Sequence, residues 1–304
     1  MDISRVAVVG AGHMGRIHLQ KLAALKEGEV VGVADTDKKV AAEVSGNYGV
    51  SFFADYRDIP EDLDGVVIAS PTETHFDIAR AFLKKGANVF IEKPIATTAE
   101  QATEIIRLAR ERNLALQVGH LERFNPAYRS ILSHIKSPVF IETRRTSNFT
   151  GRSTDIDVVL DLMIHDIDLV LSVAGKEAKN IHSQGISFVA DKYDMVNTTV
   201  EFTNGCTASL FASRISTKKE RSMSIFEKDR HIFVDLLTGK STCNIKNRDG
   251  VIETLEYVSE SMDSVMDELS EFICSIKGEK TPSVRGEDGL KALLLANRIK
   301  ERIA

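Results

Sequence analysis

A glycine-rich turn near the start of the chain constrains the fold more than any other sequence feature. It follows a valine-rich apolar run, Arg5–Gly10 (RVAVVG), of the kind that forms a strand buried on both faces. The turn reads Gly10-Ala11-Gly12-His13-Met14-Gly15, and helical spacing of apolar residues continues from it to Lys26. Such glycines permit a tight turn and a close approach of the backbone to a pyrophosphate, which meets the free N–H groups of the helix. The hexapeptide therefore predicts a dinucleotide site that includes Gly10, Gly12, His13, Met14 and Gly15.

Strand and helix signals alternate over the first 120 residues, which predicts a doubly wound parallel sheet. Besides the first strand and a shorter run at Gly49–Phe53, strands are expected at Val30–Ala34, Gly65–Ala69, Asn88–Ile91 and Ala115–Val118. After the first helix, helices are expected at Asp37–Asn47, Glu73–Lys85 and Thr98–Arg112.

The pattern changes after Gly119. From Asn180 to Tyr257 strand follows strand with turn signals between them, which predicts antiparallel order with one covered face. Helices are expected on both sides of this region, at Asn125–Ile135, Asp157–Ala174, Asp263–Lys277 and Glu287–Ile303. We therefore expect an α/β chain with a dinucleotide-binding domain at residues 1–120. Residues 121–304 are expected to form an α+β domain for substrate binding and oligomerisation, with a large, mostly antiparallel, open-faced sheet.

The composition excludes several other classes of protein. The chain has 304 residues, 43% hydrophobic and 27% charged, which excludes wholesale disorder. Its net charge of −5, without a basic block, argues against nucleic acid as a partner. No apolar run approaches the length of a membrane span or of a signal peptide. Three widely spaced cysteines form neither a disulfide framework nor a metal site, so a cytoplasmic protein without a metal is expected.

Two polar positions follow strands of the expected parallel sheet. Asp35 ends the second strand, 20 residues after Gly15, where a carboxylate binds a ribose hydroxyl and repels a 2′-phosphate. The sequence therefore favours NAD over NADP, with a turn residue as the other interpretation of Asp35. Glu92-Lys93-Pro94 ends the strand Asn88–Ile91, where a fixed cation can stabilise a developing alkoxide. A surface ion pair is the alternative for Glu92 and Lys93.

Asp161 and His165 are four residues apart in the expected helix Asp157–Ala174, so they share one face with Asp168 and Ser172. The adjacent stripe, Leu160, Ile164, Ile167 and Leu171, is apolar and should face the core. A histidine that borders buried surface can be held in one tautomer and act as a general base. A solvated helix face is the alternative interpretation of the pair.

Several of these motifs together resemble the Gfo/Idh/MocA oxidoreductase family. They are Gly10–Gly15, the run Ala69-Ser70-Pro71-Thr72-Glu73-Thr74-His75, Glu92-Lys93-Pro94, Asp161 with His165-Asp166-Ile167-Asp168, and the closing Val284–Leu290. The resemblance implies a Rossmann domain and a second domain whose open sheet builds a homodimer or homotetramer. It implies catalytic roles for Lys93, Asp161 and His165. It also implies cofactor contacts from Ser70, Pro71, Thr72, His75, Glu92 and Lys93.

The stretch Val118–Ala127 (VGHLERFNPA) resembles the branch of this family formed by UDP-N-acetylglucosamine 3-dehydrogenases. From this likeness Arg123 and Asn125 join Lys93 and His165 as candidate substrate contacts. A nucleotide diphosphate favours cations, and the second domain offers Arg123, Arg144, Arg145, Arg152 and Arg214. Ordinary surface charge is the alternative for most of these arginines.

The expected activity is a hydride transfer between a sugar hydroxyl carbon and nicotinamide. In this scheme His165 takes the hydroxyl proton, Asp161 orients the imidazole and Lys93 stabilises the oxygen. UDP-N-acetylglucosamine is the expected substrate. A dehydrogenase of a free sugar or inositol and a non-catalytic NAD-binding regulator are the alternatives.

Overall fold

A computed structural model of the chain describes residues 3–151, 156–189, 191–259 and 263–304. The chain forms two compact units. The first comprises Met1–Leu121 and Asp263–Leu290, and the second Glu122–Met262 and Lys291–Ala304. The sequence placed residues 263–290 with the second domain, and in this respect the structure differs.

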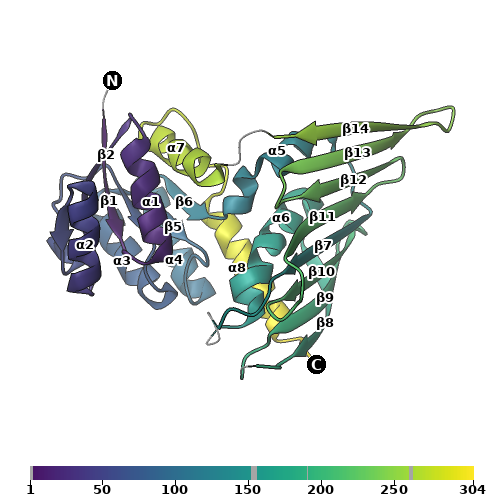
Figure 1. Cartoon of the computed structure of the whole chain (residues 1–304), viewed down its shortest axis with the longest axis horizontal. Coiled ribbons are helices and arrows are strands. Elements are labelled where there is room, and N and C mark those ends of the chain that lie inside the picture. The colour runs from purple at the N-terminus through teal and green to yellow at the C-terminus, as the bar shows by residue number, and fades with distance from the viewer. Residues whose placement is uncertain (1–2, 152–155, 190, 260–262) are drawn as a thin grey trace. The chain divides into compact units, whose positions relative to one another are not determined.

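The first unit is built on six parallel strands in the order β3-β2-β1-β4-β5-β6. The strands are β1 (Ser4–Val9), β2 (Gly28–Ala34), β3 (Ser51–Phe53), β4 (Gly65–Ile68), β5 (Asn88–Glu92) and β6 (Leu116–Gly119). The helices between them are α1 (His13–Ala24), α2 (Lys38–Tyr48), α3 (Thr72–Lys85) and α4 (Ala99–Glu111), with a short 3-10 helix η1 (Tyr56–Asp58). Figure 1 shows α1 and α2 in front of this sheet and α3 and α4 behind it. The expected doubly wound sheet is confirmed, and its strand order reverses between β1 and β4, where such sheets bind ligands.

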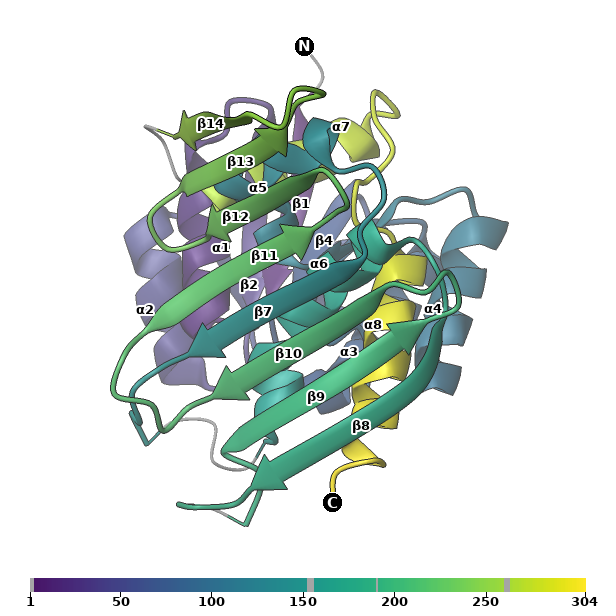
Figure 2. The ribbon, with the colours of Figure 1, turned by 90° about the vertical axis from the view of Figure 1, so that its right-hand side faces the viewer.

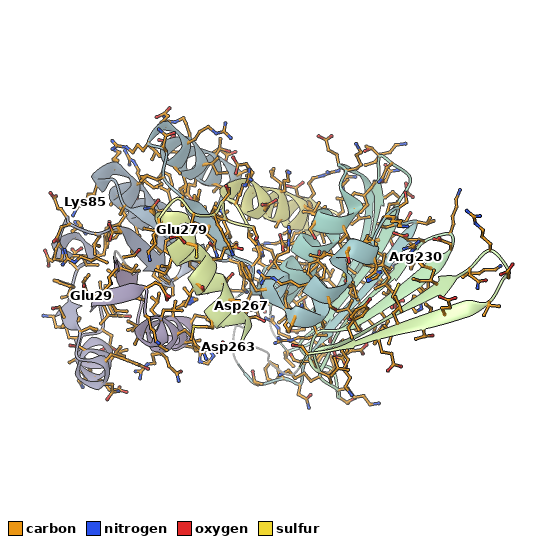
Figure 3. The ribbon with its side chains drawn as sticks, turned by 90° about the horizontal axis from the view of Figure 1, so that it is seen from above. Glu29, Lys85, Arg230, Asp263, Asp267 and Glu279 are labelled. Atoms are coloured by element: carbon orange, nitrogen blue, oxygen red, sulfur yellow. The ribbon has the colours of Figure 1, made fainter. Side chains whose placement is uncertain are left out.

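Helix α7 (Ser264–Ile276) explains why the chain returns to the first unit. Leu269, Phe272 and Ile273 are buried in the same apolar core as Val6 and Phe90 of the sheet. Asp263 caps the helix by accepting a hydrogen bond from the N–H of Met266, and it pairs with Lys21 of α1 at 2.7 Å. Figure 3 shows Asp263 and Asp267 at this end of α7. The apolar face of α7 is buried against the first sheet, and this burial places residues 263–290 in the first unit. The sequence pattern of the helix predicts an apolar face but does not tell which domain it packs against.

The second unit contains eight strands in the order β14-β13-β12-β11-β7-β10-β9-β8. They are β7 (Phe140–Thr146), β8 (Ala178–Ile186), β9 (Met195–Phe202), β10 (Thr207–Ser213), β11 (Glu220–Phe226), β12 (Arg230–Asp235), β13 (Lys240–Lys246) and β14 (Ile252–Val258). Only β7 and β10 pair in parallel among these described strands. The mostly antiparallel sheet is confirmed, but the central strand β7 was not predicted. Its sequence, FIETRRT, lacks the apolar content of a central strand because three of its seven residues are charged and one of these, Arg145, occupies a buried position.

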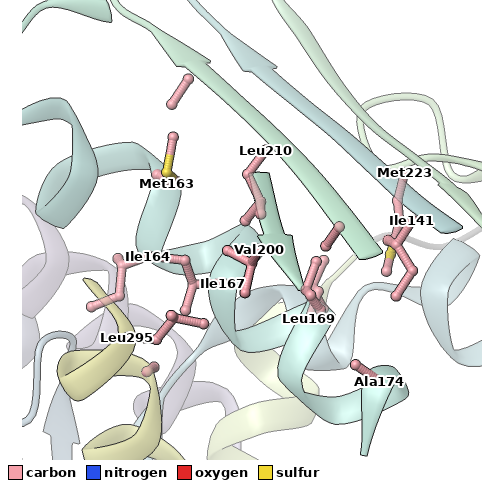
Figure 4. Packing of buried hydrophobic residues seen from close by; sticks show 14 of the residues in the cluster. Ile141, Met163, Ile164, Ile167, Leu169, Ala174, Val200, Leu210, Met223 and Leu295 are labelled. Carbon is pink, nitrogen blue, oxygen red and sulfur yellow. The ribbon is translucent and has the colours of Figure 1, made fainter. Parts of the chain in front are cut away.

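Helices cover one face of this sheet. They are α5 (Pro126–Ile131), α6 (Ile164–Ala174) and the latter part of α8 (Gly286–Lys300), with 3-10 helices η2 (Leu121–Phe124) and η3 (Leu132–His134) near α5. Figure 2 shows the opposite face toward the viewer, without a covering helix from the described part of this unit. In the core, Ile164, Ile167 and Leu169 pack with sheet residues such as Val200 (Figure 4). Ile164 and Ile167 are fully buried and Leu160 and Leu171 partly buried, so the predicted apolar stripe is confirmed.

No helix in the described ranges is long and apolar enough to cross a membrane.

Candidate active site

The glycine turn opens α1 as the sequence predicts. Gly10 has a φ of +99°, and its N–H donates to the carbonyl of Ala34 at 2.8 Å. A Cβ on Gly15 would lie 1.8 Å from the carbonyl oxygen of Gly10, whereas a Cβ on Gly12 would meet no atom within 4 Å. Gly12 is therefore the glycine that faces open space at the helix N-terminus, where a phosphate binds. His13 and Met14 form the first turn beside it, His13 exposed and Met14 half-buried.

Asp35 lies directly after β2 and touches the glycine turn. One carboxylate oxygen accepts from the N–H of Ala11 at 2.6 Å and the other from the N–H of Asp37 at 2.8 Å. These bonds hold the turn against the strand end and fix the direction of the carboxylate.

A pocket of about 270 Å³ opens beside Asp35 at the carboxyl edge of the sheet. It is lined by Val9, Gly10, Ala34, Asp35, Thr36, Ala54, Asp55, Tyr56, Arg57, Ser70, Pro71, Thr74 and Ile78. The pocket thus brings together Gly10, Asp35, Ser70 and Pro71, four of the predicted cofactor residues. Its size and carboxylate fit the adenosine end of a dinucleotide. Sequence reasoning missed Asp55, Tyr56 and Arg57, although they follow the short strand β3 and so share this edge.

His75 and Thr72 lie on α3 but do not line the pocket. The ring of His75 is buried, with its nitrogens 2.9 Å from the carbonyl of Ser70 and 3.0 Å from that of Pro94. Burial lowers the pKa of His75, against the effect of these two carbonyls. Thr72 is the first residue of α3. His75 thereby ties the segment around Ser70 to the one around Pro94, and its direct contact with a cofactor stays a prediction.

Lys93 leaves the end of β5, and its peptide bond to Pro94 is cis. The neighbouring Glu92 pairs with His18 of α1, with 2.7 Å between its Oε1 and the ring Nε2. Burial opposes ionisation of Glu92, but the bond from His18 and the charges of His18 and Lys93 outweigh it, so the pKa of Glu92 is lowered. Glu92 is therefore a carboxylate held inside the first unit beside Lys93.

Asp161 and His165 lie on two different kinds of helix. Asp161 belongs to a π-helical turn, η4 (Val159–Met163), and His165 is the second residue of α6, which continues from it. The sequence predicted one α-helix through both residues. Single π-helical turns inside α-helices are rare and occur frequently at functional sites. Both side chains are half-buried.

Arg123 and Asn125 have structural partners within the second unit. The guanidinium of Arg123 forms two bonds with Asp168, of 2.6 and 3.0 Å. The buried Asn125 caps α5 through the N–H of Ala127, and its amide group donates to the carbonyl of Leu236. These bonds explain both residues in the fold, and their contact with a substrate stays a prediction.

Comparison with known proteins places the chain among dehydrogenases. The family described as "Oxidoreductase family, NAD-binding Rossmann fold" matches residues 4–120, and the GFO/IDH/MocA C-terminal domain matches residues 129–231. A UDP-N-acetylglucosamine 3-dehydrogenase of Acidithiobacillus ferrooxidans is 34% identical, over 97% of this chain and 96% of that one. A crystal structure of that enzyme superimposes with a TM-score of 0.93, covering 100% of this chain and 98% of the other.

A second relative, an inositol 2-dehydrogenase of Rhizobium meliloti, is 25% identical over 99% of this chain and 97% of its own. A scyllo-inositol dehydrogenase of Lactobacillus casei, solved with NAD(H) and scyllo-inositol, shares the fold with a TM-score of 0.86 at 21% identity, covering 99% and 97% of the two chains. The two domain matches follow each other in the order of the two sheets described above. The chain therefore belongs to the Gfo/Idh/MocA family of NAD-binding oxidoreductases.

Proposed function

We propose that this chain is an NAD-dependent UDP-N-acetylglucosamine 3-dehydrogenase. The observation that carries the proposal is the 34% identity, over nearly the whole of both chains, to the enzyme of that name from A. ferrooxidans. The glycine turn, the pocket beside Asp35 and the Glu92-Lys93-Pro94 segment support a dehydrogenase site in the first unit.

Bound nicotinamide supplies the chemistry by accepting a hydride from the sugar carbon. In this proposal His165 takes the hydroxyl proton and Asp161 orients its ring. Lys93, with Glu92 ionised beside it, stabilises the negative charge that develops on the oxygen. Lys93 belongs to the first unit of the chain and His165 to the second.

NAD is the proposed cofactor in preference to NADP. Asp35 presents a carboxylate to the pocket that would take the adenosine ribose, and such a charge repels a 2′-phosphate. Arg57 also lines this pocket, but its Nε lies 3.0 Å from Asp55, which compensates its charge. A lower KM for NAD than for NADP tests the assignment.

The open face of the eight-stranded sheet is proposed to join subunits in a homodimer or homotetramer, which sedimentation of the purified protein tests. The protein is proposed to act in the reducing environment of the cytoplasm, because Cys206, Cys243 and Cys274 form no disulfide bond.

An assay for NADH formation tests the function directly. We expect absorbance at the NADH wavelength with UDP-N-acetylglucosamine, and none with N-acetylglucosamine or inositol. Lys93→Ala and His165→Ala should each lower kcat on the order of 10²-fold with NAD binding retained. Lys84→Ala, which removes an exposed lysine at the end of α3, is the matched control and should keep full activity.

Two other outcomes would select a different function. Oxidation of inositol alone would favour the second candidate, which rests on the inositol 2-dehydrogenase relative. Tight NAD binding with no oxidation of any sugar would favour a non-catalytic regulator.

A further inference from the structure

The second unit contains an arginine whose charge is poorly compensated by its surroundings. Arg221 lies on β11, directly opposite Arg145 of β7. Both face the helix-covered side of the sheet, because Ile141, Thr143, Met223 and Ile225, at alternate positions of the same strands, are buried in or beside that core. Like charges at directly opposite positions of two strands repel each other.

The buried carboxylates near these arginines bind Arg145. Arg145 donates to Glu122 at 2.7 Å and to one oxygen of Asp166 at 2.7 and 3.0 Å. The other oxygen of Asp166 is buried and accepts no hydrogen bond from any described atom. Arg145 and Asp166 are each 2% exposed, so this is a closed ion-pair cluster.

Arg221 stands at the open side of the cluster. Within the described residues its side chain makes one polar contact, 3.5 Å from the Glu122 oxygen that Arg145 already binds. Its side chain is 39% exposed. Burial and the charge of Arg145 lower the pKa of Arg221, since they penalise its positive form more than Glu122 and Asp166 favour it. The guanidinium stays protonated.

The neighbours of Arg221 connect it to the proposed site. Asp166 follows His165 in α6, and Glu122 precedes Arg123 in η2, the 3-10 helix after β6. The backbone carbonyl of Arg221 accepts from Leu236, whose own carbonyl binds Asn125. Arg221 thus lies beside the helical turn that carries the proposed base and beside the segment with likeness to the nucleotide-sugar branch.

We propose that Arg221 binds the diphosphate of the nucleotide-sugar substrate, an inference that rests on the proposed function. A partly desolvated guanidinium next to a second cation forms strong, short bonds with phosphate oxygens, often two at once. Of the five arginines that the sequence offered, the four that the structure describes do not match this description. Arg123, Arg145 and Arg214 bind buried carboxylates, Arg144 lies over the ring of Phe211, and Arg152 lies outside the described residues.

Calorimetric titration of the NAD-loaded protein with UDP, and steady-state kinetics with UDP-N-acetylglucosamine, test the proposal. Arg221→Gln should weaken UDP binding and raise the KM for UDP-N-acetylglucosamine by about 10- to 100-fold. The KM for NAD should change less than about twofold. Arg248→Gln is the matched control, since it removes an exposed arginine from the turn between β13 and β14, and it should leave the affinity for UDP and the KM for UDP-N-acetylglucosamine unchanged.

Arg221→Lys is a second, more conservative variant, which keeps the test valid if Arg221→Gln does not fold. It keeps the charge and loses the planar pair of donors, so UDP binding should fall to a value between wild type and Arg221→Gln. Binding of UDP by Arg221→Lys and Arg221→Gln as tightly as by wild type overturns the inference. Wild type that binds UDP through Arg221 but does not oxidise the sugar refutes the proposed function while the inference stands. Inorganic phosphate in place of UDP should bind weakly, and binding as tight as that of UDP would contradict a diphosphate site.

Discussion

Alanine substitutions at Gly15 and Gly12 should have different effects, because the fold requires a glycine at position 15 and the bound cofactor requires one at position 12. Gly15→Ala places a methyl group 1.8 Å from the carbonyl oxygen of Gly10 and 2.8 Å from its carbon. Because both are backbone atoms, α1 and the turn must move apart to admit the methyl group. Overpacking of this kind costs up to about 3 kcal/mol, and alanine's helix preference returns about 1 kcal/mol. A net loss of about 2 kcal/mol corresponds to a fall in Tm of roughly 4–8 °C.

Gly12→Ala should act on binding alone. Gly12 caps α1 with φ −69° and ψ −161°, which alanine adopts without strain, and the new Cβ meets no protein atom within 4 Å. The loss of stability should stay below about 1 kcal/mol. The methyl group occupies the space in which the pyrophosphate approaches the helix N–H groups, so NADH affinity should fall about 10- to 100-fold, or about 1.4–2.7 kcal/mol.

Two measurements on each variant distinguish these effects. Thermal unfolding by circular dichroism gives the stability, and titration followed by NADH fluorescence gives the affinity. The chain has no tryptophan, so the NADH signal is free of tryptophan emission. Gly12→Ala that binds NADH as tightly as wild type would refute the assignment of this turn to the pyrophosphate. Gly15→Ala that melts with wild type would refute the packing argument.

Three further predictions concern single side chains. Asp35→Ala should raise the Kd for NAD at least tenfold and reduce the preference for NAD over NADP. The variant loses both the carboxylate charge and the hydrogen bonds to the N–H groups of Ala11 and Asp37. Unchanged affinities for NAD and NADP would exclude a contact between Asp35 and the ribose. Burial raises the pKa of Tyr128 to about 12, so its neutral form stabilises the fold below pH 10 and this stabilisation is lost as the pH rises from 10 to 12. Urea unfolding at pH 10 and 11 should show the free energy of unfolding of wild type falling by about 1 kcal/mol more than that of Tyr128→Phe, and identical losses would contradict the assignment. Burial raises the pKa of the Cys206 thiol to about 11, so iodoacetamide at pH 8 should label it far more slowly than a free thiol, as mass spectrometry of the native protein can measure.

Local pattern was sufficient wherever the relevant partners are close in the sequence. The glycine turn, the alternation of strands and helices, and the apolar stripe through Ile164 and Ile167 are short-range signals, and the structure confirms each of them. The pocket also follows from the sequence in part, because strands of a parallel sheet end at a common edge. Gly10, Asp35, Ser70 and Pro71 meet there although they lie on different segments.

What the sequence determined by itself is therefore the fold class, the family and the edge of the sheet at which the pocket beside Asp35 opens. Tertiary structure alone decided which charged residues are buried. Arg145 reads as a surface residue until Glu122 and Asp166, from two other elements, supply its carboxylates, and this is why the central strand β7 escaped prediction. The tertiary structure also packs α7 on the first sheet and pairs Glu92 with His18. It places Arg221 beside Glu122 and Asp166, whose carboxylates already bind Arg145. The physical reason is that a charged side chain can be buried only with partners of opposite charge, and these come from distant parts of the chain. The periodicity of apolar residues along the sequence does not identify such partners.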